Sequence, residues 1–301
     1  MHKLDLNGIL PPVPTPFDSR GNLDLEGLTR NVARYNQAGL VGYIALGSNG
    51  EAVHLTAEES TQVIKTIKNA AAPGRAIVAG VNEFTSRAAI QAIQRASDLG
   101  ADAVLVVTPY YYKGAMTQEA LLRHFTTVAD SSPLPVLLYN VPQNTGVVIE
   151  PATIASLSSH ENIVGIKDSA GNMSAIADTI RRTSSGFFVM VGNGAIFYPS
   201  LVMGAAGAVL AVACVAPEAC VELYQAFKAN EYAKARELHN RIAPLSQLVT
   251  AGLGVAGLKA AMEIAGLTGG PPRSPLLDVG ETGRQTIRTV MRDTGLFPTI
   301  E

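Results

Sequence analysis

Residues 163–171 read Ile-Val-Gly-Ile-Lys-Asp-Ser-Ala-Gly. The segment begins as a short apolar run, which is typical of a buried strand, carries one lysine, Lys167, and then breaks into small and polar residues. Lysine is among the residues least often buried, because an unpaired ammonium loses its hydration. Desolvation favours the neutral amine, which can attack a carbonyl and form a Schiff base. The alternative is a lysine at the end of a strand whose ammonium reaches solvent.

The other lysines of the chain lie in polar or amphipathic surroundings that indicate helix faces and loops. None of them directly follows a strand-like apolar run. Lys167 is therefore predicted to be the one lysine in apolar surroundings, and it is the first candidate for a reactive side chain.

Seven further apolar runs of strand length lie along the chain, and a segment of helical type follows each of the eight runs. The expected strands cover residues 8–17, 42–47, 76–81, 103–109, 135–142, 163–169, 187–193 and 208–215. The expected helices cover residues 24–38, 56–71, 85–99, 117–129, 151–158, 173–182, 195–203 and 217–230. Such a series predicts an α/β protein built as a closed (β/α)8 TIM barrel, with an open doubly wound sheet as the alternative. No Gly-x-Gly-x-x-Gly follows the first strand, which counts against a dinucleotide-binding fold.

From residue 231 onward the pattern becomes purely helical, with expected helices over 231–248, 255–265 and 281–294. We therefore predict a barrel that carries the active site over residues 1–230 and a C-terminal helical appendage over residues 231–301. The appendage is expected to lie on the barrel and not to form an independent domain.

Composition narrows the class of protein. At 301 residues, with 47% hydrophobic and 16% charged residues, the chain can bury a large core and lies outside the disordered class. A net charge of −2 without a basic run argues against a nucleic-acid partner. The two cysteines, Cys214 and Cys220, and the five histidines show no metal-ligand spacing, so no metal site is expected.

The expected location is cytoplasmic. Both cysteines are predicted to be buried thiols, as suits a reducing compartment. Residues 1–17 contain no long apolar region, so no signal peptide is expected. Residues 183–217 carry no charge and are long enough to span a bilayer, but glycines and Pro199 interrupt them. A buried strand–helix–strand unit is predicted there instead of a membrane span.

In a barrel of this kind the reactive groups lie at the carboxyl ends of the strands. The second strand ends in Gly-Ser-Asn-Gly-Glu at 47–51, where the backbone can turn sharply and offer N–H groups to an anion. A turn without function is the alternative. The fourth strand ends at Tyr110, Tyr111 and Tyr112, which could also be interface aromatics, and the fifth at Tyr139. An amine, phenols and a small hydroxyl at one barrel mouth suit proton transfer beside a Schiff base without a metal.

Glycines flank the end of the seventh strand and the start of the eighth, as Gly192-Asn193-Gly194 and at 204–207. Phosphate sites in barrels often lie near these two strands. Because no lysine or arginine lies close by in the sequence, tight backbone packing is predicted there in preference to phosphate binding.

Four motifs, taken together and in this order, resemble the dihydrodipicolinate synthase / N-acetylneuraminate lyase family of class I, pyruvate-handling aldolases. The motifs are Gly-Ser-Asn-Gly-Glu at 47–51, Thr-Pro-Tyr-Tyr at 108–111, Tyr-Asn-Val-Pro at 139–142 with Thr-Gly at 145–146, and Gly-Ile-Lys-Asp at 165–168. The resemblance runs nearly end to end and implies a TIM barrel that forms a covalent Schiff base with its substrate and uses no cofactor.

By this resemblance Lys167 is the Schiff-base lysine and Tyr139 the phenol that transfers the proton. Ser48, with the backbone amides of Ser48 and Asn49, holds the pyruvate carboxylate, and Val209 supplies a backbone carbonyl near the lysine. Tyr111 completes the relay, in the family from the neighbouring subunit. The resemblance therefore implies at least a dimer and usually a homotetramer, a dimer of dimers.

The choice among family members depends on a few residues around the motifs. Dihydrodipicolinate synthases carry an arginine, which binds the carboxylate of aspartate semialdehyde, where this chain has Asn144. Together Asn49, Asn144 and Asp168-Ser169 look more like 4-hydroxy-2-oxoglutarate aldolases. In such enzymes Asn49 and Ser169 contact the distal end of the substrate, and Asn144 is expected to line the same site.

The sequence therefore predicts an aldolase that cleaves a 4-hydroxy-2-oxo acid, with 4-hydroxy-2-oxoglutarate as the expected substrate and pyruvate and glyoxylate as products. Other family activities remain open: a 2-keto-3-deoxy sugar-acid aldolase or dehydratase, and 4-hydroxy-tetrahydrodipicolinate synthase, which condenses pyruvate with aspartate semialdehyde. The alternative of another class is a barrel that binds a keto acid without turnover.

Overall fold

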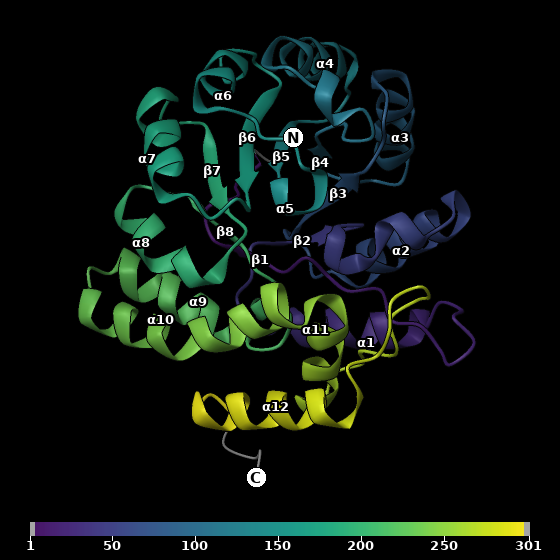
Figure 1. The fold of residues 1–301 in the computed structure, drawn as a ribbon, viewed down its shortest axis with the longest axis vertical. Coiled ribbons are helices and arrows are strands. Elements are labelled where there is room, and N and C mark those ends of the chain that lie inside the picture. The colour runs from purple at the N-terminus through teal and green to yellow at the C-terminus, as the bar shows by residue number, and fades with distance from the viewer. Residues whose placement is uncertain (1–3, 298–301) are drawn as a thin grey trace.

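The chain folds into a barrel of eight parallel strands, here described from a computed structural model over residues 4–297 (Figure 1). The strands are β1 (Ile9–Leu10), β2 (Gly42–Ala45), β3 (Ala76–Val81), β4 (Ala103–Val107), β5 (Val136–Asn140), β6 (Ile163–Asp168), β7 (Phe188–Val191) and β8 (Gly207–Val209). They pair in the order β1-β8-β7-β6-β5-β4-β3-β2. The Ile44 N–H donates to Pro11 O at 3.0 Å and the Val13 N–H to Ile44 O at 3.0 Å, which closes the ring between β1 and β2. The predicted TIM barrel is confirmed.

Two strands are much shorter than predicted. The first covers only Ile9–Leu10 of the expected residues 8–17, because the prolines that follow have no N–H to donate to a neighbouring strand. The eighth was expected over residues 208–215 but ends at Val209, and a 3₁₀ turn follows at Ala211–Cys214. Val209 pairs with Leu10, so β8 ends where its short partner ends.

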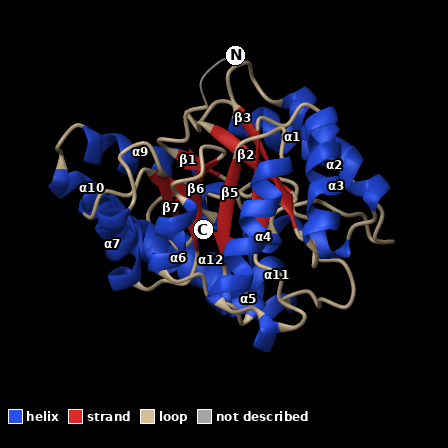
Figure 2. Ribbon diagram, turned by 90° about the horizontal axis from the view of Figure 1, so that it is seen from above, coloured by secondary structure: helices blue, strands red, loops and turns tan. Residues whose placement is uncertain are grey.

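A helix covers the outside of the barrel after each strand, as Figure 2 shows from above. These helices are α1 (Leu25–Tyr35), α2 (Ala57–Ala70), α3 (Ser86–Asp98), α4 (Gln118–Ser131), α6 (Pro151–Leu157), α7 (Met173–Arg182), α8 (Phe197–Val202) and α9 (Pro217–Lys228). A short further helix, α5 (Pro142–Thr145), was not predicted, because Pro142 was counted as the end of the fifth strand. Proline suits the first turn of a helix, where its missing N–H has no intrahelical partner.

The C-terminal part is helical, as predicted. It consists of α10 (Tyr232–Gln247), α11 (Gly254–Ile264) and α12 (Gly280–Asp293), with a π-helical turn at Leu248–Gly252 between α10 and α11. In Figure 1, α10 lies along α8 and α9, and α12 is the outermost helix. We call these residues, from α10 to α12, the helical part.

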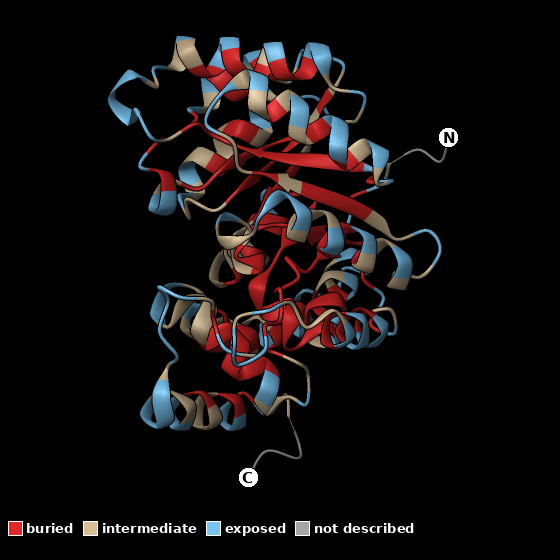
Figure 3. Ribbon diagram, turned by 90° about the vertical axis from the view of Figure 1, so that its right-hand side faces the viewer, coloured by how far each residue is buried: buried red, intermediate tan, exposed pale blue. Residues whose placement is uncertain are grey.

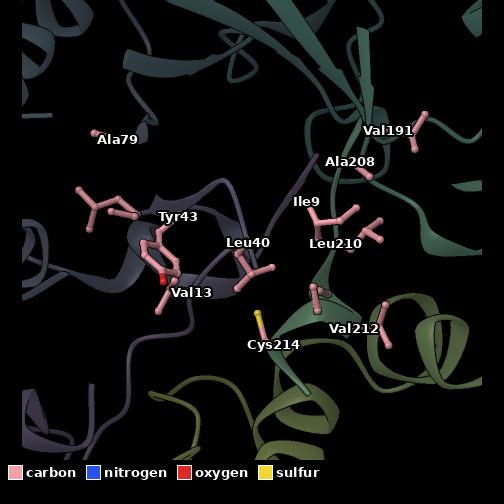
Figure 4. Close-up of a cluster of buried hydrophobic side chains, with 14 of the residues drawn as sticks. Ile9, Val13, Leu40, Tyr43, Ala79, Val191, Ala208, Leu210, Val212 and Cys214 are labelled. Atoms are coloured by element: carbon pink, nitrogen blue, oxygen red, sulfur yellow. The ribbon is translucent and has the colours of Figure 1, made fainter. Parts of the chain in front are cut away.

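The core has two layers, and the strands are buried on both faces (Figure 3). One layer lies between strands and helices, and Figure 4 shows part of it around Leu40, Tyr43 and Val212. The other fills the barrel interior with side chains that include Leu105, Leu137, Tyr139, Met190 and Val209. Because side chains alternate along a strand, residues 137 and 139 of β5 point inward while residues 136 and 138 face the helices.

Residues 183–217 form β7, α8 and β8 with their connections, the strand–helix–strand unit that was predicted. Within residues 4–297, no helix combines the length and apolar character that crossing a bilayer requires.

Candidate active site

Lys167 and Tyr139 lie side by side inside the barrel. They are paired in register on β6 and β5, and both side chains point inward. The Lys167 side chain is only 3% exposed, and its Nζ lies 4.2 Å from the centre of the Tyr139 ring. The alternative in which the Lys167 ammonium reaches bulk solvent is therefore wrong.

The hydroxyl of Tyr139 faces other polar groups at the strand ends. Its oxygen lies 3.5 Å from Ser48 Oγ. Burial alone would raise the pKa of the phenol, but the nearby Lys167 ammonium and hydrogen bonds with Ser48, Lys167 and Ser169 outweigh burial and lower that pKa. A phenol with a lowered pKa can give and take a proton more readily near neutral pH.

Ser48 belongs to a tight turn after β2. Residues 48–50 form one turn of 3₁₀ helix, in which the Gly50 N–H donates to Gly47 O at 2.9 Å. Thr15 Oγ1 donates to Gly50 O at 2.7 Å and so ties the turn to the N-terminal segment. The first amides of a helical turn have no partner within it, so those of Ser48 and Asn49 can face a carboxylate. We call residues 47–51 the anion turn.

Gly192 was predicted to serve backbone packing, and the structure shows what it packs against. A Cβ at this position would lie 2.0 Å from Ser169 Oγ and 3.0 Å from Lys167 Cε. The Gly192 N–H also donates to Asp168 O at 2.7 Å, so the backbone cannot move away freely. A glycine is needed here because the Ser169 side chain, and behind it the Lys167 stem, occupy the space that a Cβ would take. The signal in the sequence was the position of Gly192 at the end of the seventh strand, which is the strand after the one that carries Lys167.

We expect Gly192→Ala to impair the site without unfolding the barrel. The new methyl group displaces Ser169 and the Lys167 stem, and a displacement of about 1 Å in a reacting group can cost on the order of 10²-fold in rate. Schiff-base formation is measured by borohydride reduction with pyruvate and peptide mass. The matched control is Gly186→Ala, just before β7, where a Cβ meets nothing within 4 Å. Wild-type trapping kinetics in Gly192→Ala would contradict the proposed place of the lysine stem.

Asp168 stabilises the strand ends from outside the barrel interior, because it points to the opposite face from its neighbour Lys167. Asn140 Nδ2 donates to Asp168 Oδ2 at 2.7 Å, and the Asn140 Oδ1 accepts from the Ile149 N–H at 3.1 Å. Burial raises the pKa of Asp168. Hydrogen bonds from Asn140 and from backbone amides lower it, but they offset the effect of burial only in part. This pair fixes the ends of β5 and β6 next to the reactive side chains.

The remaining predicted site residues differ in where they lie and in how far they are buried. Val209 is buried at the end of β8 in the interior layer, and Asn49 is partly buried in the anion turn. Asn144 is exposed on α5. Tyr111 is 72% exposed, and its ring contacts Phe84 and Tyr112 at centroid distances of 6.2 and 5.1 Å. Within one chain, Tyr111 is therefore part of an exposed aromatic group.

The sequence reasoning missed a second buried lysine. Lys259 on α11 is 1% exposed, and its Nζ lies 2.5 Å from Oε1 of Glu51, the last residue of the anion turn. The prediction that Lys167 is the one lysine in apolar surroundings is therefore wrong. The run Gly-Leu-Lys-Ala-Ala-Met at 257–262, apolar on every side of the lysine, was the signal that could have found it.

Across residues 4–297, no cluster of three or more His, Cys, Asp or Glu side chains could hold a metal ion. An amine, a phenol with a lowered pKa and an anion-binding turn at one barrel mouth can together bind a keto acid, form an imine with it and move a proton.

Comparison with known proteins agrees with this geometry. Residues 5–294 match the dihydrodipicolinate synthetase family. The 4-hydroxy-tetrahydrodipicolinate synthase of Methanopyrus kandleri is 35% identical over 295 residues, which are 97% of this chain and 98% of that protein.

Solved structures show the same fold. A dihydrodipicolinate synthase of Bacillus anthracis superposes with a TM-score of 0.92 at 32% identity, covering 96% of this chain and 99% of that one. The prophage protein YagE of E. coli K12, solved in complex with pyruvate, superposes with a TM-score of 0.90 at 30% identity and covers 96% and 99% of the two chains. Members of the family are pyruvate-dependent lyases and synthases that work through a lysine Schiff base and need no external cofactor. With a match over nearly its whole length and relatives above 30% identity, this chain belongs to the dihydrodipicolinate synthetase family and is a carbon–carbon lyase of that kind.

Proposed function

We propose that the enzyme cleaves 4-hydroxy-2-oxoglutarate to pyruvate and glyoxylate, with Lys167 as the Schiff-base residue. The observation that carries the proposal is the buried Lys167 amine beside the Tyr139 phenol, whose hydroxyl faces Ser48. Such an arrangement would bring a nucleophile and a proton carrier within reach of one small substrate, which supports the proposal.

The reaction follows from these positions. The Lys167 amine attacks the C2 ketone, and loss of water gives an iminium. Tyr139 takes the proton of the C4 hydroxyl as the C3–C4 bond breaks, and the electron pair moves into the iminium to give the enamine of pyruvate. Glyoxylate leaves, C3 of the enamine is protonated, and hydrolysis releases pyruvate and the free amine.

The anion turn is the proposed site for the pyruvate carboxylate. Ser48 Oγ and the amides of Ser48 and Asn49 would hold the carboxylate, and the backbone carbonyl of Val209 would help to orient the lysine. Ser48 lies next to both the turn amides and the Tyr139 hydroxyl, so it can link carboxylate binding to proton transfer.

The distal end of the substrate would meet Asn49, Ser169 and Asn144. Ser169 lies at the end of β6, where its N–H donates to Asn140 O at 2.8 Å. Asn144 replaces the arginine by which dihydrodipicolinate synthases bind aspartate semialdehyde, and an amide cannot form the bidentate, charged contact that a guanidinium makes. This replacement supports the 4-hydroxy-2-oxo acid as substrate.

One observation favours a second candidate. The relative from Methanopyrus kandleri is named 4-hydroxy-tetrahydrodipicolinate synthase, which would make the second substrate aspartate semialdehyde. The lysine, the phenol and the anion turn would serve that condensation equally, because both reactions pass through the enamine of pyruvate. The two candidates differ only at the distal end of the site.

Tyr111 is proposed to act from one copy of the chain on its neighbour. It is exposed beside Phe84 and Tyr112, and an exposed group of aromatic rings is typical of an interface. We propose a homotetramer, a dimer of dimers, in which this aromatic group is covered and the Tyr111 hydroxyl completes the relay to Tyr139.

We also propose that the enzyme works in the cytoplasm. Cys214 and Cys220 are both buried free thiols. Burial raises the pKa of both thiols, so they stay protonated and unreactive. Unpaired, inert thiols suit a reducing compartment.

A substrate panel tests the proposal. The enzyme is given 4-hydroxy-2-oxoglutarate, 2-keto-3-deoxygluconate, or pyruvate with aspartate semialdehyde, and pyruvate is followed in each case. We expect the highest kcat/KM for 4-hydroxy-2-oxoglutarate, by about tenfold or more, since one hydrogen bond to a charged group contributes ~1.5–3 kcal/mol. Faster turnover of the sugar acid, or faster consumption of pyruvate with the semialdehyde, would assign that activity instead. No turnover of any substrate would contradict the aldolase proposal.

A further inference from the structure

A buried ion pair joins the anion turn to the helical part. Glu51 ends the turn, and Lys259 lies on α11, far along the chain. The two side chains are each 1% exposed, and Nζ of Lys259 lies 2.5 Å from Oε1 of Glu51. The other carboxylate oxygen, Oε2, accepts from the backbone N–H of Arg273 at 2.8 Å. The Lys259 ammonium and the Arg273 N–H therefore both reach this carboxylate from the helical part, while a third contact, from His54 Nδ1 at 3.3 Å to Oε2, comes from just beyond the turn itself.

The surroundings of Lys259 hold its amine in place. Nζ donates to Pro271 O at 3.1 Å and lies 4.3 Å from the centre of the Phe17 ring. Burial lowers the pKa of Lys259, although the Glu51 carboxylate acts in the opposite direction. The desolvation cost of a buried ion pair makes it a weak source of stability, so the Glu51–Lys259 pair is better explained by the geometry that it fixes.

The segment that follows α11 is pressed against the same residues. A Cβ on Gly269 would lie 2.1 Å from Lys259 O, and one on Gly270 would lie 2.3 Å from Phe17 O. Gly270 also adopts φ = +67°, which favours glycine. The segment after α11 therefore packs directly against the backbone of Lys259 and against Phe17 of the N-terminal segment.

Glu51 needs this support because its backbone is strained. It adopts a left-handed conformation with φ = 52°, which is uncommon for a residue with a side chain and persists only when its surroundings hold it. Thr15 holds the preceding residue, Gly50, from the other side through its carbonyl. The position of Ser48 thus depends on two anchors, and the carboxylate of Glu51 is the one that reaches the helical part.

We infer that Lys259 is a positioning residue for pyruvate binding: from the helical part it holds Glu51, and through Glu51 it sets the anion turn so that Ser48 and its amides face the substrate carboxylate. The inference rests on the proposed function, because it takes the turn as the pyruvate site. The helical part then contributes to substrate binding without touching the substrate.

The test titrates Schiff-base formation in Lys259→Met, which keeps the length of the side chain and removes its charge. The enzyme is incubated with increasing pyruvate and reduced with borohydride, and the modified fraction of Lys167 is measured by peptide mass. We expect full modification at saturation but a half-saturating pyruvate concentration about tenfold higher or more, as for the loss of one hydrogen bond to a charged group. A merely structural role would instead lower the saturating fraction and leave the midpoint unchanged, which would overturn the inference.

The matched control is Arg241→Met. Arg241 lies on α10 and donates to Thr294 O at 2.9 Å, just after α12, and its hydrogen bonds among the described residues do not reach the anion turn. Its replacement removes a basic side chain of the same region, and we expect a wild-type midpoint. An equal rise of the midpoint in Arg241→Met would show that any loosening of the helical part has this effect, and would overturn the specific role of Lys259.

Lys259→Met removes the ammonium from the buried Glu51 carboxylate, which can prevent folding. In that case the double variant Glu51→Gln/Lys259→Met, which removes both charges and keeps both volumes, takes its place. We expect the raised midpoint to persist in the double variant, and a wild-type midpoint would overturn the inference. If the wild-type enzyme forms no adduct at Lys167, the proposed function fails. If the wild-type enzyme forms the adduct and the Lys259 variants have the same pyruvate midpoint as the wild type, only the inference about Lys259 fails.

Discussion

Lys167→Met is expected to lose all trapping of pyruvate by borohydride and to lower kcat on the order of 10⁴-fold or more, as removal of a covalent nucleophile does in other enzymes. The reason is that the amine which forms the iminium is gone, and the buried site offers no second amine beside Tyr139 within residues 4–297. Lys259, the other lysine that is buried in the described part of the chain, is held in its ion pair with Glu51. Methionine fills the space of the lysine stem, so the barrel is expected to stay folded, as circular dichroism can verify.

The control for this variant is Lys65→Met, which removes an exposed lysine from α2. It should trap pyruvate and turn over substrate as the wild-type enzyme does. Peptide mapping of the wild-type adduct completes the experiment, since the reduced label is expected on residue 167 alone. A label on another lysine, or undiminished trapping in Lys167→Met, would remove Lys167 from the mechanism.

Tyr139→Phe removes only the phenolic hydroxyl and is expected to lower kcat by ~10²–10⁴-fold, the usual contribution of a general acid–base group. Lys167 remains, so pyruvate can still be trapped by borohydride. Burial acts to raise the pKa of Tyr139, but the Lys167 charge and the hydrogen bonds outweigh burial and lower it. The phenolate is the form that takes the proton, so wild-type kcat should rise with pH at values below the free-phenol pKa of ~10. The variant should lack this rise.

Tyr232→Phe is the matched control for this prediction. Tyr232 is half exposed on α10, in the helical part and not on a barrel strand. Its hydroxyl donates to Asn230 Oδ1 at 2.7 Å. Its kcat and pH profile should equal those of the wild-type enzyme. A Tyr139→Phe enzyme with unchanged kcat would show that another group moves the proton.

Much of the fold was predictable from local patterns. Eight apolar runs with helices between them specify a barrel, because each run is bounded by glycine, proline or a helix cap within a few residues of its ends. Thr56 and Glu59, three residues apart at the start of α2, form a capping box, in which the Thr56 N–H donates to Glu59 Oε2 at 2.9 Å. The first and eighth strands were predicted too long because hydrophobicity persists beyond them, whereas strand length depends on a partner that can accept and donate hydrogen bonds.

The sequence by itself determined the barrel, the lysine on its sixth strand and the tyrosine on its fifth, since apolar periodicity and strand ends depend on neighbours along the chain. Only the tertiary structure decided that Gly192 leaves room for the lysine stem and that Glu51 pairs with Lys259 from the helical part. These contacts join residues that are distant in sequence, and they depend on strand register and on how the helices pack. No local pattern encodes them, because the apolar run around Lys259 looks the same whether or not a carboxylate lies across from it.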